Sequence, residues 1–356
     1  MTISRCWIWV LAASAALAAV TSCGLPPPYG NARQAEVRQA AFKPQPLWFG
    51  GYLDVTLVPA HRLQDSPPDG KVTTVLSFIV SDAANPCEPS WGGFHDLEQA
   101  DERLDLGGQV DRFRKAGNDV AVSFGGQAGT DPAVGCTDGD ALVRAYAAVI
   151  AKYGLDIVDL DIEGAGLANP AAAKRRAAAI ARLQAERLPA DPLKVWLTLP
   201  VSADGLTPSA KTAIGTMLDA GVELAGVNIM TMNFGPLAPG QTMLEAAVSA
   251  AEGTQRTLAA LYEKTGKPLG AAALWNKIGL TPMIGTNDVK GQVFTLDDAA
   301  GLNSFAQERG VGRISIWSLN RDTGCGSQLR NGVSNSCSGV DQEPGMFAKL
   351  LGSGRS

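Results

Sequence analysis

Apolar runs recur along the chain from Leu47 onward and are separated by segments with a helical pattern. Several runs are nearly continuous apolar strings rather than clean alternations, which is typical of parallel strands covered on their outer face. The strand-like runs are Phe49–Val58, Val72–Val80, Asp119–Phe124, Leu155–Ile162, Val195–Pro200, Gly226–Met232, Leu269–Ile284 and Arg313–Leu319. The clearest helical segments are Gly139–Tyr153, Ala171–Leu188, Thr242–Lys264 and Leu296–Arg309. Strands that alternate with helices predict a parallel sheet.

This order of elements predicts an α/β protein, a closed (β/α)8 TIM barrel in a single domain over residues 47–352. Eight strands over about three hundred residues suit such a barrel, and a doubly wound open sheet is the alternative. The active site of a barrel lies at the carboxyl ends of its strands. Unusual residues cluster at the predicted ends of the third, fourth, sixth and eighth strands.

The first residues predict a targeting segment. Arg5 precedes an apolar run that ends at Val20 and is shorter than the roughly 20 residues of a membrane-spanning helix, which indicates a signal peptide over 1–22. Val20-Thr21-Ser22-Cys23 resembles the lipobox of bacterial lipoproteins, so we expect Cys23 to carry a lipid and residues 23–46, rich in proline at both ends, to form a tether. We expect an exported protein, held at the bacterial membrane by its lipid only. Simple secretion is the alternative.

The cysteines of the mature domain fit an oxidising compartment. They are Cys87, Cys136, Cys325 and Cys337, an even number that allows three pairings. The last two are near neighbours in a stretch rich in Gly, Ser and Asn, so we predict the disulfides Cys325–Cys337 and Cys87–Cys136. A zinc site is the alternative, but it lacks CxxC or His spacing.

Composition and charge narrow the class of protein. The chain is 46% hydrophobic and 18% charged, which is typical of a globular protein. Its net charge is −5, with acids and bases interspersed, and no basic stripe indicates a nucleic-acid partner. We expect a monomer without a cofactor.

Three acids share one face of the fourth predicted strand. In the stretch DIVDLDIE, Asp159, Asp161 and Glu163 alternate with apolar residues. Since side chains two apart on a strand point the same way, the acids face the barrel axis. A carboxylate that remains charged in a partly dry interior costs several kcal/mol, and its like-charged neighbours add to that cost. We therefore expect shared protons and raised pKa values within this row.

Three interpretations of the row compete. It could be the solvated face of an edge strand, but the apolar outer face and the flanking helices count against this. It could bind a hard cation such as Mg²⁺ or Ca²⁺, but ligands in one straight row, without His or acidic partners on other strands, form a poor cage. General acid/base catalysis, in which acidic neighbours keep one group protonated, fits best, and we expect no metal.

The row also carries a family resemblance. Asp156-x-x-Asp159-x-Asp161-x-Glu163 matches the DxxDxDxE signature of glycoside hydrolase family 18, the chitinases and their relatives. Ser123-Phe124-Gly125-Gly126 resembles the SxGG motif on the third strand of that family. The resemblance implies supporting roles for Asp156, Ser123, Gly125 and Gly126.

The later motifs follow in the order of that family. Met230-Thr231-Met232-Asn233 resembles the sixth-strand motif, usually Met-x-Tyr-Asp, and Trp317 stands at the place of the eighth-strand Trp. Gly279–Val289 also resembles bacterial chitinases. Met232 and Asn233 depart from the usual Tyr and Asp, and Asn can neither ionise nor supply a phenol. The resemblance implies that Trp317 lies under the sugar and that Asn233 can form a hydrogen bond to its acetamide. We also expect sugar contacts from Tyr52, Met230, Met232 and Gln127, with a place in the core as the alternative for Tyr52 and the two methionines.

The resemblance implies a role for each acid. Glu163 would be the general acid and later the base. Asp161 would turn toward the N-acetyl group of the substrate, and Asp159 would hold a proton or trade it with Asp161. The acetamido carbonyl of the sugar would replace an enzyme nucleophile, with retention.

These features together predict a chitinase that cleaves β-1,4-linked N-acetylglucosamine polymers, with endo action expected. An endo-β-N-acetylglucosaminidase acting on glycans or cell wall is one alternative. A non-catalytic chitin lectin on the same barrel is the other, although such lectins usually lose the acid at the position of Glu163.

Overall fold

The computed structural model describes residues 47–65, 72–326 and 332–355, which lie within one compact unit, Lys43–Ser356. The predicted signal peptide over 1–22, Cys23 and the tether over 23–46 fall outside these residues. No helix in the described ranges is long and apolar enough to cross a membrane.

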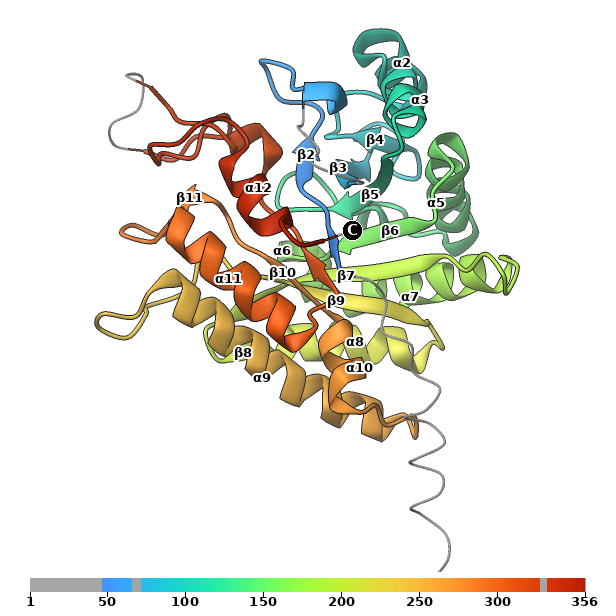
Figure 1. The fold of residues 1–356 in the computed structure, drawn as a ribbon. Helices are drawn as coiled ribbons and strands as arrows, with labels where there is room; N and C mark the ends of the chain where they lie inside the picture. The colour runs from blue at the N-terminus through green and yellow to red at the C-terminus, as the bar shows by residue number, and fades with distance from the viewer. Residues whose placement is uncertain (1–46, 66–71, 327–331, 356) are drawn as a thin grey trace, which may run out of the picture. The chain divides into compact units, whose positions relative to one another are not determined.

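Parallel strands form a closed barrel, which confirms the predicted (β/α)8 fold (Figure 1). The barrel strands are β1 (Trp48–Phe49), β2 (Tyr52–Asp54), β3 (Thr73–Ser81), β5 (Asp119–Gly125), β6 (Ile157–Asp161), β7 (Lys194–Ser202), β9 (Leu224–Met230), β10 (Ile278–Thr281) and β13 (Arg313–Ile314). Strands β1 and β2 are two halves of one strand: β1 pairs with β13 and β2 with β3, both in parallel, and this closes the ring.

Helices and short hairpins surround the barrel. The helices are α2 (Leu97–Leu104), α3 (Leu106–Lys115), α4 (Pro132–Gly135), α5 (Gly139–Tyr153), α6 (Gly164–Ala168), α7 (Pro170–Ala185), α8 (Pro208–Asp219), α9 (Met243–Lys264), α10 (Ala271–Asn276), α11 (Leu296–Arg309) and α12 (Met346–Gly352), with 3-10 turns η1 (Leu63–Asp65) and η2 (Leu319–Arg321). The remaining strands, β4 (Pro89–Trp91), β8 (Gly205–Leu206), β11 (Gly285–Thr286) and β12 (Val293–Phe294), form antiparallel pairs.

Three predicted strands were partly wrong. The run Phe49–Val58 is strand only at Phe49 and over Tyr52–Asp54, and a turn follows at Val55. The run Leu269–Ile284 begins as helix α10, because Ala271-Ala272-Ala273-Leu274 has high helix propensity, and only Ile278–Thr281 is strand. The last run, Arg313–Leu319, is a regular strand only over Arg313–Ile314 and ends in a 3-10 turn.

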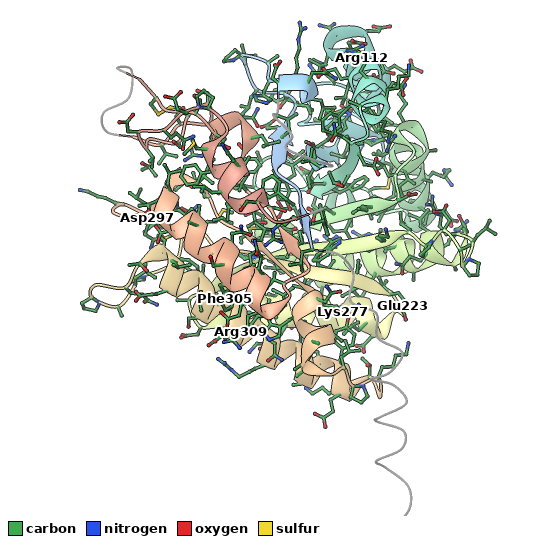
Figure 2. The ribbon with its side chains drawn as sticks, in the orientation of Figure 1. Arg112, Glu223, Lys277, Asp297, Phe305 and Arg309 are labelled. Carbon is green, nitrogen blue, oxygen red and sulfur yellow. A yellow bond between two sulfur atoms is a disulfide. The ribbon has the colours of Figure 1, made fainter. Side chains whose placement is uncertain are left out.

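The outer layer is held by apolar and aromatic packing. Helices α9 and α11 lie side by side on one side of the barrel (Figure 1). Phe305 and Arg309 both belong to α11 (Figure 2). The guanidinium of Arg309 lies 5.8 Å from the ring of Phe305 and 5.7 Å from that of Trp275 in α10. Such contacts cover the outer faces of the strands, so the polar side chains that point inward are cut off from water.

Candidate active site

The three acids of the row lie along and just beyond strand β6. Val158 and Leu160 are buried on the apolar face of the strand, and Asp159 and Asp161 point the other way with exposures of 0% and 6%. Glu163 follows the end of the strand and is the N-cap of the short helix α6. The alternation of the sequence therefore does bring the acids to one side, at the carboxyl end of a barrel strand.

Asp159 is held by four donors from four different strands. Its Oδ2 accepts hydrogen bonds from Tyr52 Oη at 2.9 Å and Ser123 Oγ at 2.7 Å. Its Oδ1 accepts from Thr198 Oγ1 at 2.8 Å and from Arg313 Nη1 at 2.7 Å. A carboxylate that accepts this many hydrogen bonds, one of them from a guanidinium, is stabilised in its charged form.

A second layer of polar side chains supports these donors. Thr281 Oγ1 donates to Asn228 Oδ1 at 2.9 Å, and Asn228 Nδ2 donates to Tyr52 Oη at 3.2 Å and to Thr198 Oγ1 at 3.0 Å. All these residues are buried inside the barrel. The network fixes the orientation of each hydroxyl group around the carboxylate.

This arrangement gives the surroundings in which Asp159 would play its expected role. The sequence predicts that Asp159 holds a proton or trades it with Asp161, but its acceptor positions are occupied by donors. The part that Asp159 takes in proton exchange stays a prediction.

Asp161 and Glu163 have raised pKa values. For Asp161 the largest cause is desolvation by burial, followed by the negative charges of Glu163 and Asp159, and the nearby Arg313 opposes the shift. For Glu163 the cause is burial. The Oδ1 of Asp161 is buried and has no hydrogen-bond partner among the described residues. A site with raised carboxyl pKa values can keep a proton near neutral pH and deliver it.

The SFGG motif allows strand β5 to approach the row closely. Gly125 has φ +105°, and a Cβ there would lie 2.1 Å from the carbonyl oxygen of Asp161. Gly126 has φ +85°, donates its N–H to the same carbonyl at 3.0 Å, and would place a Cβ 2.9 Å from the ring of Phe78. Only glycine fits both positions, which gives the predicted supporting roles a steric basis.

An aromatic floor lies beside the acids. Trp317 is half-buried and stacks on Phe78 with ring centroids 5.4 Å apart. Tyr52 lies next to both rings, but it is only 1% exposed. The structure therefore favours the core role for Tyr52, because its ring is buried and its hydroxyl group donates to Asp159. Phe78 was not predicted, since it stands within an apolar strand and nothing in its neighbours marks it.

The end of strand β9 is fastened to a loop. Asn233 Nδ2 donates to Asp288 Oδ2 at 2.7 Å, and the backbone N–H of Asp288 donates to Asn233 Oδ1 at 2.8 Å. The backbone N–H of Asn233 donates to Asn287 Oδ1 at 3.0 Å. The amide of Asn233 is thus engaged by protein groups at its nitrogen and its oxygen, and its expected hydrogen bond to the acetamide stays a prediction. Met230 is buried and Met232 half-buried.

The fourth acid of the signature does not join the others. Asp156 precedes strand β6, is 54% exposed, and forms an ion pair of 2.8 Å with Arg187. Its supporting role is therefore structural, at the amino end of the strand. Gln127 follows the glycine pair and is exposed, so its predicted contact with sugar stays a prediction.

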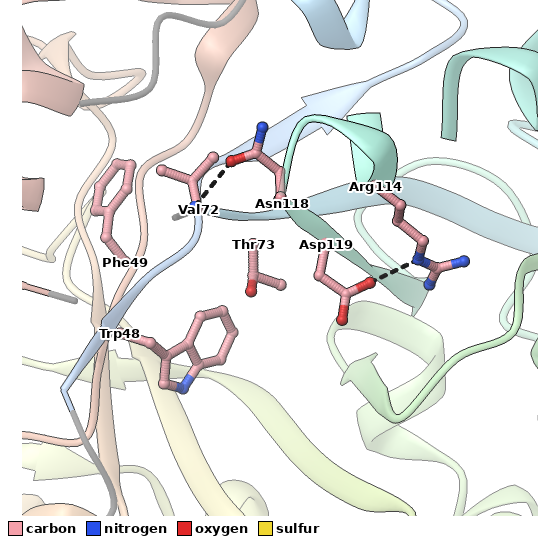
Figure 3. A pocket seen from close by; sticks show the side chains of 8 residues that line it. Trp48, Phe49, Val72, Thr73, Arg114, Asn118 and Asp119 are labelled. Carbon is pink, nitrogen blue, oxygen red and sulfur yellow. Dashed lines mark hydrogen bonds and ion pairs between the residues drawn. The ribbon is translucent and has the colours of Figure 1, made fainter. Parts of the chain in front are cut away.

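A pocket in the described structure lies at the opposite end of the barrel. It is lined by Trp48, Thr73 and Asp119, which begin strands β1, β3 and β5, and by the Arg114–Asp119 ion pair (Figure 3). The pocket is separate from the acid row, because its residues begin their strands whereas the acids lie at the carboxyl end of β6. Barrel enzymes have their active sites at the carboxyl ends of the strands. Within 47–65, 72–326 and 332–355, no group of three His, Cys, Asp or Glu side chains is placed to hold a metal.

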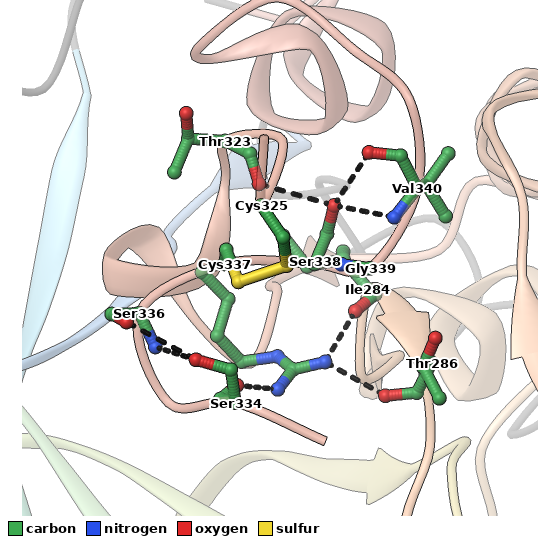
Figure 4. The surroundings of a disulfide bond; sticks show 11 residues. Ile284, Thr286, Thr323, Cys325, Ser334, Ser336, Cys337, Ser338, Gly339 and Val340 are labelled. Carbon is green, nitrogen blue, oxygen red and sulfur yellow. Dashed lines mark hydrogen bonds between the residues drawn. A yellow bond between two sulfur atoms is a disulfide. The ribbon is translucent and has the colours of Figure 1, made fainter. Parts of the chain in front are cut away.

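Both disulfides have the predicted pairing. Cys87 is joined to Cys136 and Cys325 to Cys337. The first ties the β3–β4 hairpin to the segment after α4. The second joins Cys325 and Cys337 and closes a loop (Figure 4). Near this loop, buried Arg321 donates to the carbonyl oxygens of Ile284 and Thr286.

Comparison with known proteins gives consistent relatives, although no family model matches the chain. A probable bifunctional chitinase/lysozyme of Escherichia coli strain K12 is 32% identical over 299 residues, 80% of this chain and 32% of the relative. Endochitinase 11 of Metarhizium anisopliae is 32% identical over 293 residues, 78% of this chain and 54% of the relative. The chain thus spans about a third and about half of these two relatives.

Solved structures give the same result. The catalytic domain of a hyperthermophilic chitinase from Pyrococcus furiosus superposes with a TM-score of 0.74 at 28% identity, covering 86% of this chain and 94% of that one. A GH18 chitinase from Pseudoalteromonas aurantia, at 16% identity and a TM-score of 0.53 over 76% of this chain and 94% of that one, shares the fold. These similarities support a chitinase-like glycoside hydrolase with the fold of family 18.

Proposed function

We propose that this chain is a chitinase that hydrolyses β-1,4-linked N-acetylglucosamine polymers by a retaining, substrate-assisted reaction. The observation that carries the proposal is the row itself. Asp161 and Glu163 both have raised pKa values, and they lie at a strand end beside Asp159, which is paired with Arg313. Trp317 supplies a flat apolar surface next to them, of the kind on which sugar rings stack.

The proposed reaction uses the substrate as its own nucleophile. Glu163 gives its proton to the glycosidic oxygen while the bond from that oxygen to the anomeric carbon breaks. The acetamido carbonyl oxygen bonds to the same carbon and forms an oxazolinium ion, and Asp161 stabilises the positive charge through the acetamido N–H. Water then attacks the anomeric carbon while the bond between this carbon and the acetamido oxygen breaks, and Glu163 takes a proton from the water.

Endo action is the mode that we propose. It is supported by the sequence, which lacks an obvious long insertion between the late strands that would wall a deep tunnel, and by the similarity to a protein named as an endochitinase. The analysis of products from chitin oligomers of defined length tests it. Internal cleavage of the longer oligomers supports endo action, and release of one fixed unit from one end contradicts it.

A second substrate has support from one relative, which is named as a chitinase/lysozyme. Parallel assays on chitin oligomers and on peptidoglycan separate the two activities, and cleavage of peptidoglycan alone would overturn the chitinase assignment.

We also propose that the protein acts outside the cytoplasm, fixed to the membrane by a lipid at Cys23. The two disulfides are consistent with an oxidising compartment.

Replacement of the acid tests the mechanism. Glu163→Gln removes the proton donor but keeps the shape, so we expect kcat to fall by at least about 100-fold with oligosaccharide binding retained. Asp156→Asn is the matched control, because this exposed signature acid lies at the other end of strand β6. A Glu163→Gln enzyme that works at nearly the rate of the wild type refutes the role of Glu163.

A further inference from the structure

A fully buried cation lies beneath the acid row. Arg313, the first residue of strand β13, has 0% exposure, and its Nη1 donates to Asp159 Oδ1 at 2.7 Å. Its Nε donates to Ser315 Oγ at 2.7 Å. The partner Asp159 is also 0% exposed, so this ion pair is removed from water on both sides.

Aromatic rings surround the remainder of the guanidinium. Its Cζ lies 4.8 Å from the ring centroid of Trp48, 5.4 Å from that of Tyr52 and 5.5 Å from that of Trp196. Its Nη2 has no hydrogen-bond partner among the described residues. Ring faces attract a cation but cannot neutralise it, so Asp159 is the carboxylate that balances this charge.

The pairing restricts where a proton can reside. An arginine remains charged in proteins, and a buried arginine needs a paired anion. Protonation of Asp159 would leave the cation without its partner, while the hydroxyl donors of Tyr52 and Ser123 also favour the charged carboxylate. A structural interpretation, in which the pair only braces the barrel, predicts that Asp159→Asn does not change the titration of the row once Arg313 has been replaced.

We propose that Arg313 is a positioning residue that keeps Asp159 a permanent anion, so that the exchangeable protons of the row stay on Asp161 and Glu163. This inference rests on the proposed function. Arg313 in strand β13 would thus keep the exchangeable proton close to the glycosidic bond, on Asp161 or Glu163.

The electrostatics of Asp161 provide the readout. The charged groups that act on it are Glu163, Asp159, Arg313 and Asp131. Asp159 and Asp131 raise its pKa, while Arg313 lowers it. Asp131 is itself paired with the buried Arg176 at 2.8 Å, so this second ion pair stays constant when Arg313 is changed.

A double-mutant cycle tests the proposal through the pH dependence of kcat/KM on a chitin oligomer. Arg313→Met removes the positive charge, so the row should keep its protons to higher pH. The pKa that defines the alkaline limb of the profile should rise by about one pH unit. Asp159→Asn removes the negative charge and leaves the cation, so the limb should move to lower pH. The double variant removes both charges, and its limb should return close to that of the wild type.

Two further variants separate charge from structure. Arg313→Lys keeps the charge without the planar group, so its alkaline limb should stay within a few tenths of a unit of the wild type. Arg321→Met removes another buried guanidinium, which binds backbone carbonyls rather than a carboxylate, and should lower stability without moving the limb. The proposal is overturned if the alkaline limb of the pH profile is unchanged in Arg313→Met, or if it is the same in Arg313→Met and in the double variant.

The order of thermal stability provides a readout that does not depend on hydrolysis. Arg313→Met should unfold at a lower temperature than the double variant, because a lone buried carboxylate is less stable than no charge at all. A double variant that unfolds first would overturn the proposal. If the wild type cleaves no N-acetylglucosamine polymer, the proposed function fails, and the stability order still decides whether the pair fixes the anion.

Discussion

The close approach of strands β5 and β6 at Gly125 gives the sharpest test of the site geometry. The substitution Gly125→Ala adds a single methyl group. That Cβ would lie 2.1 Å from the carbonyl oxygen of Asp161, and the oxygen is held in place by the backbone N–H of Gly126 at 3.0 Å. Neither strand can yield alone, because both belong to a closed barrel, so the new methyl group should push the Asp161 segment outward.

Two contributions determine the magnitude. Gly125 has φ +105°, a conformation that costs an alanine roughly 1–3 kcal/mol. The steric overlap requires a shift of about 1 Å, and overpacking of this kind costs about 1–3 kcal/mol more. We therefore expect a total loss of about 2–6 kcal/mol in the free energy of unfolding. A displacement of about 1 Å at the acids should also lower kcat/KM by about 100-fold.

Gly117→Ala is the matched control, since Gly117 has φ +92° and a Cβ added there would meet no other atom within 4 Å. It carries the backbone cost without the overlap. Urea unfolding and kcat/KM on a chitin oligomer should be measured for both variants. If Gly125→Ala is as stable and as active as Gly117→Ala, the contact between Gly125 and Asp161 does not hold the site in place.

Three other changes have defined outcomes. Asp161→Asn should lower kcat by at least about 100-fold. Because burial raises the pKa of Asp161 in the folded wild type, the stability of the wild type falls as the pH rises from about 4 through that pKa. Thermal unfolding should therefore show the Asn variant becoming more stable relative to the wild type over this range. Asp288→Ala removes the side-chain contact with Asn233, so it should lower the free energy of urea unfolding by about 1 kcal/mol and raise KM more than it lowers kcat. An unchanged KM would show that the contact between Asn233 and Asp288 does not shape the site. Replacement of Cys87 and Cys136 by Ser should cost about 2–4 kcal/mol, and reduced wild type that unfolds like the oxidised protein contradicts this.

The hydrophobic pattern of the sequence was sufficient to predict most of the helices and strands of the barrel. Gly139–Tyr153 and Leu296–Arg309 were predicted with the bounds that α5 and α11 have, because both helices begin after a polar N-cap and end at a left-handed glycine. The pattern failed over Leu269–Ile284, where an alanine-rich turn of helix is as apolar as a strand. Periodicity over so few residues does not separate the two.

The partners of the acids could not be predicted in the same way. Thr198, Asn228 and Arg313 are single polar residues within apolar strands, and each makes its contact with a residue at least 30 positions away. A strand pattern shows which side a residue faces but not which residue lies opposite. Only the closure of the barrel brings these side chains to one carboxylate.

The signature acids show how physical reasoning and motif matching can diverge. Asp159, Asp161 and Glu163 are two apart, so they share a side, whereas Asp156 is three positions before Asp159 and cannot share it on a regular strand. The resemblance grouped all four acids, and the structure separates Asp156, which pairs with Arg187 at the amino end of the strand. The spacing alone was sufficient to predict this separation. The charge that balances the row instead comes from Arg313, which is far from Asp159 in the sequence but lies against it inside the barrel.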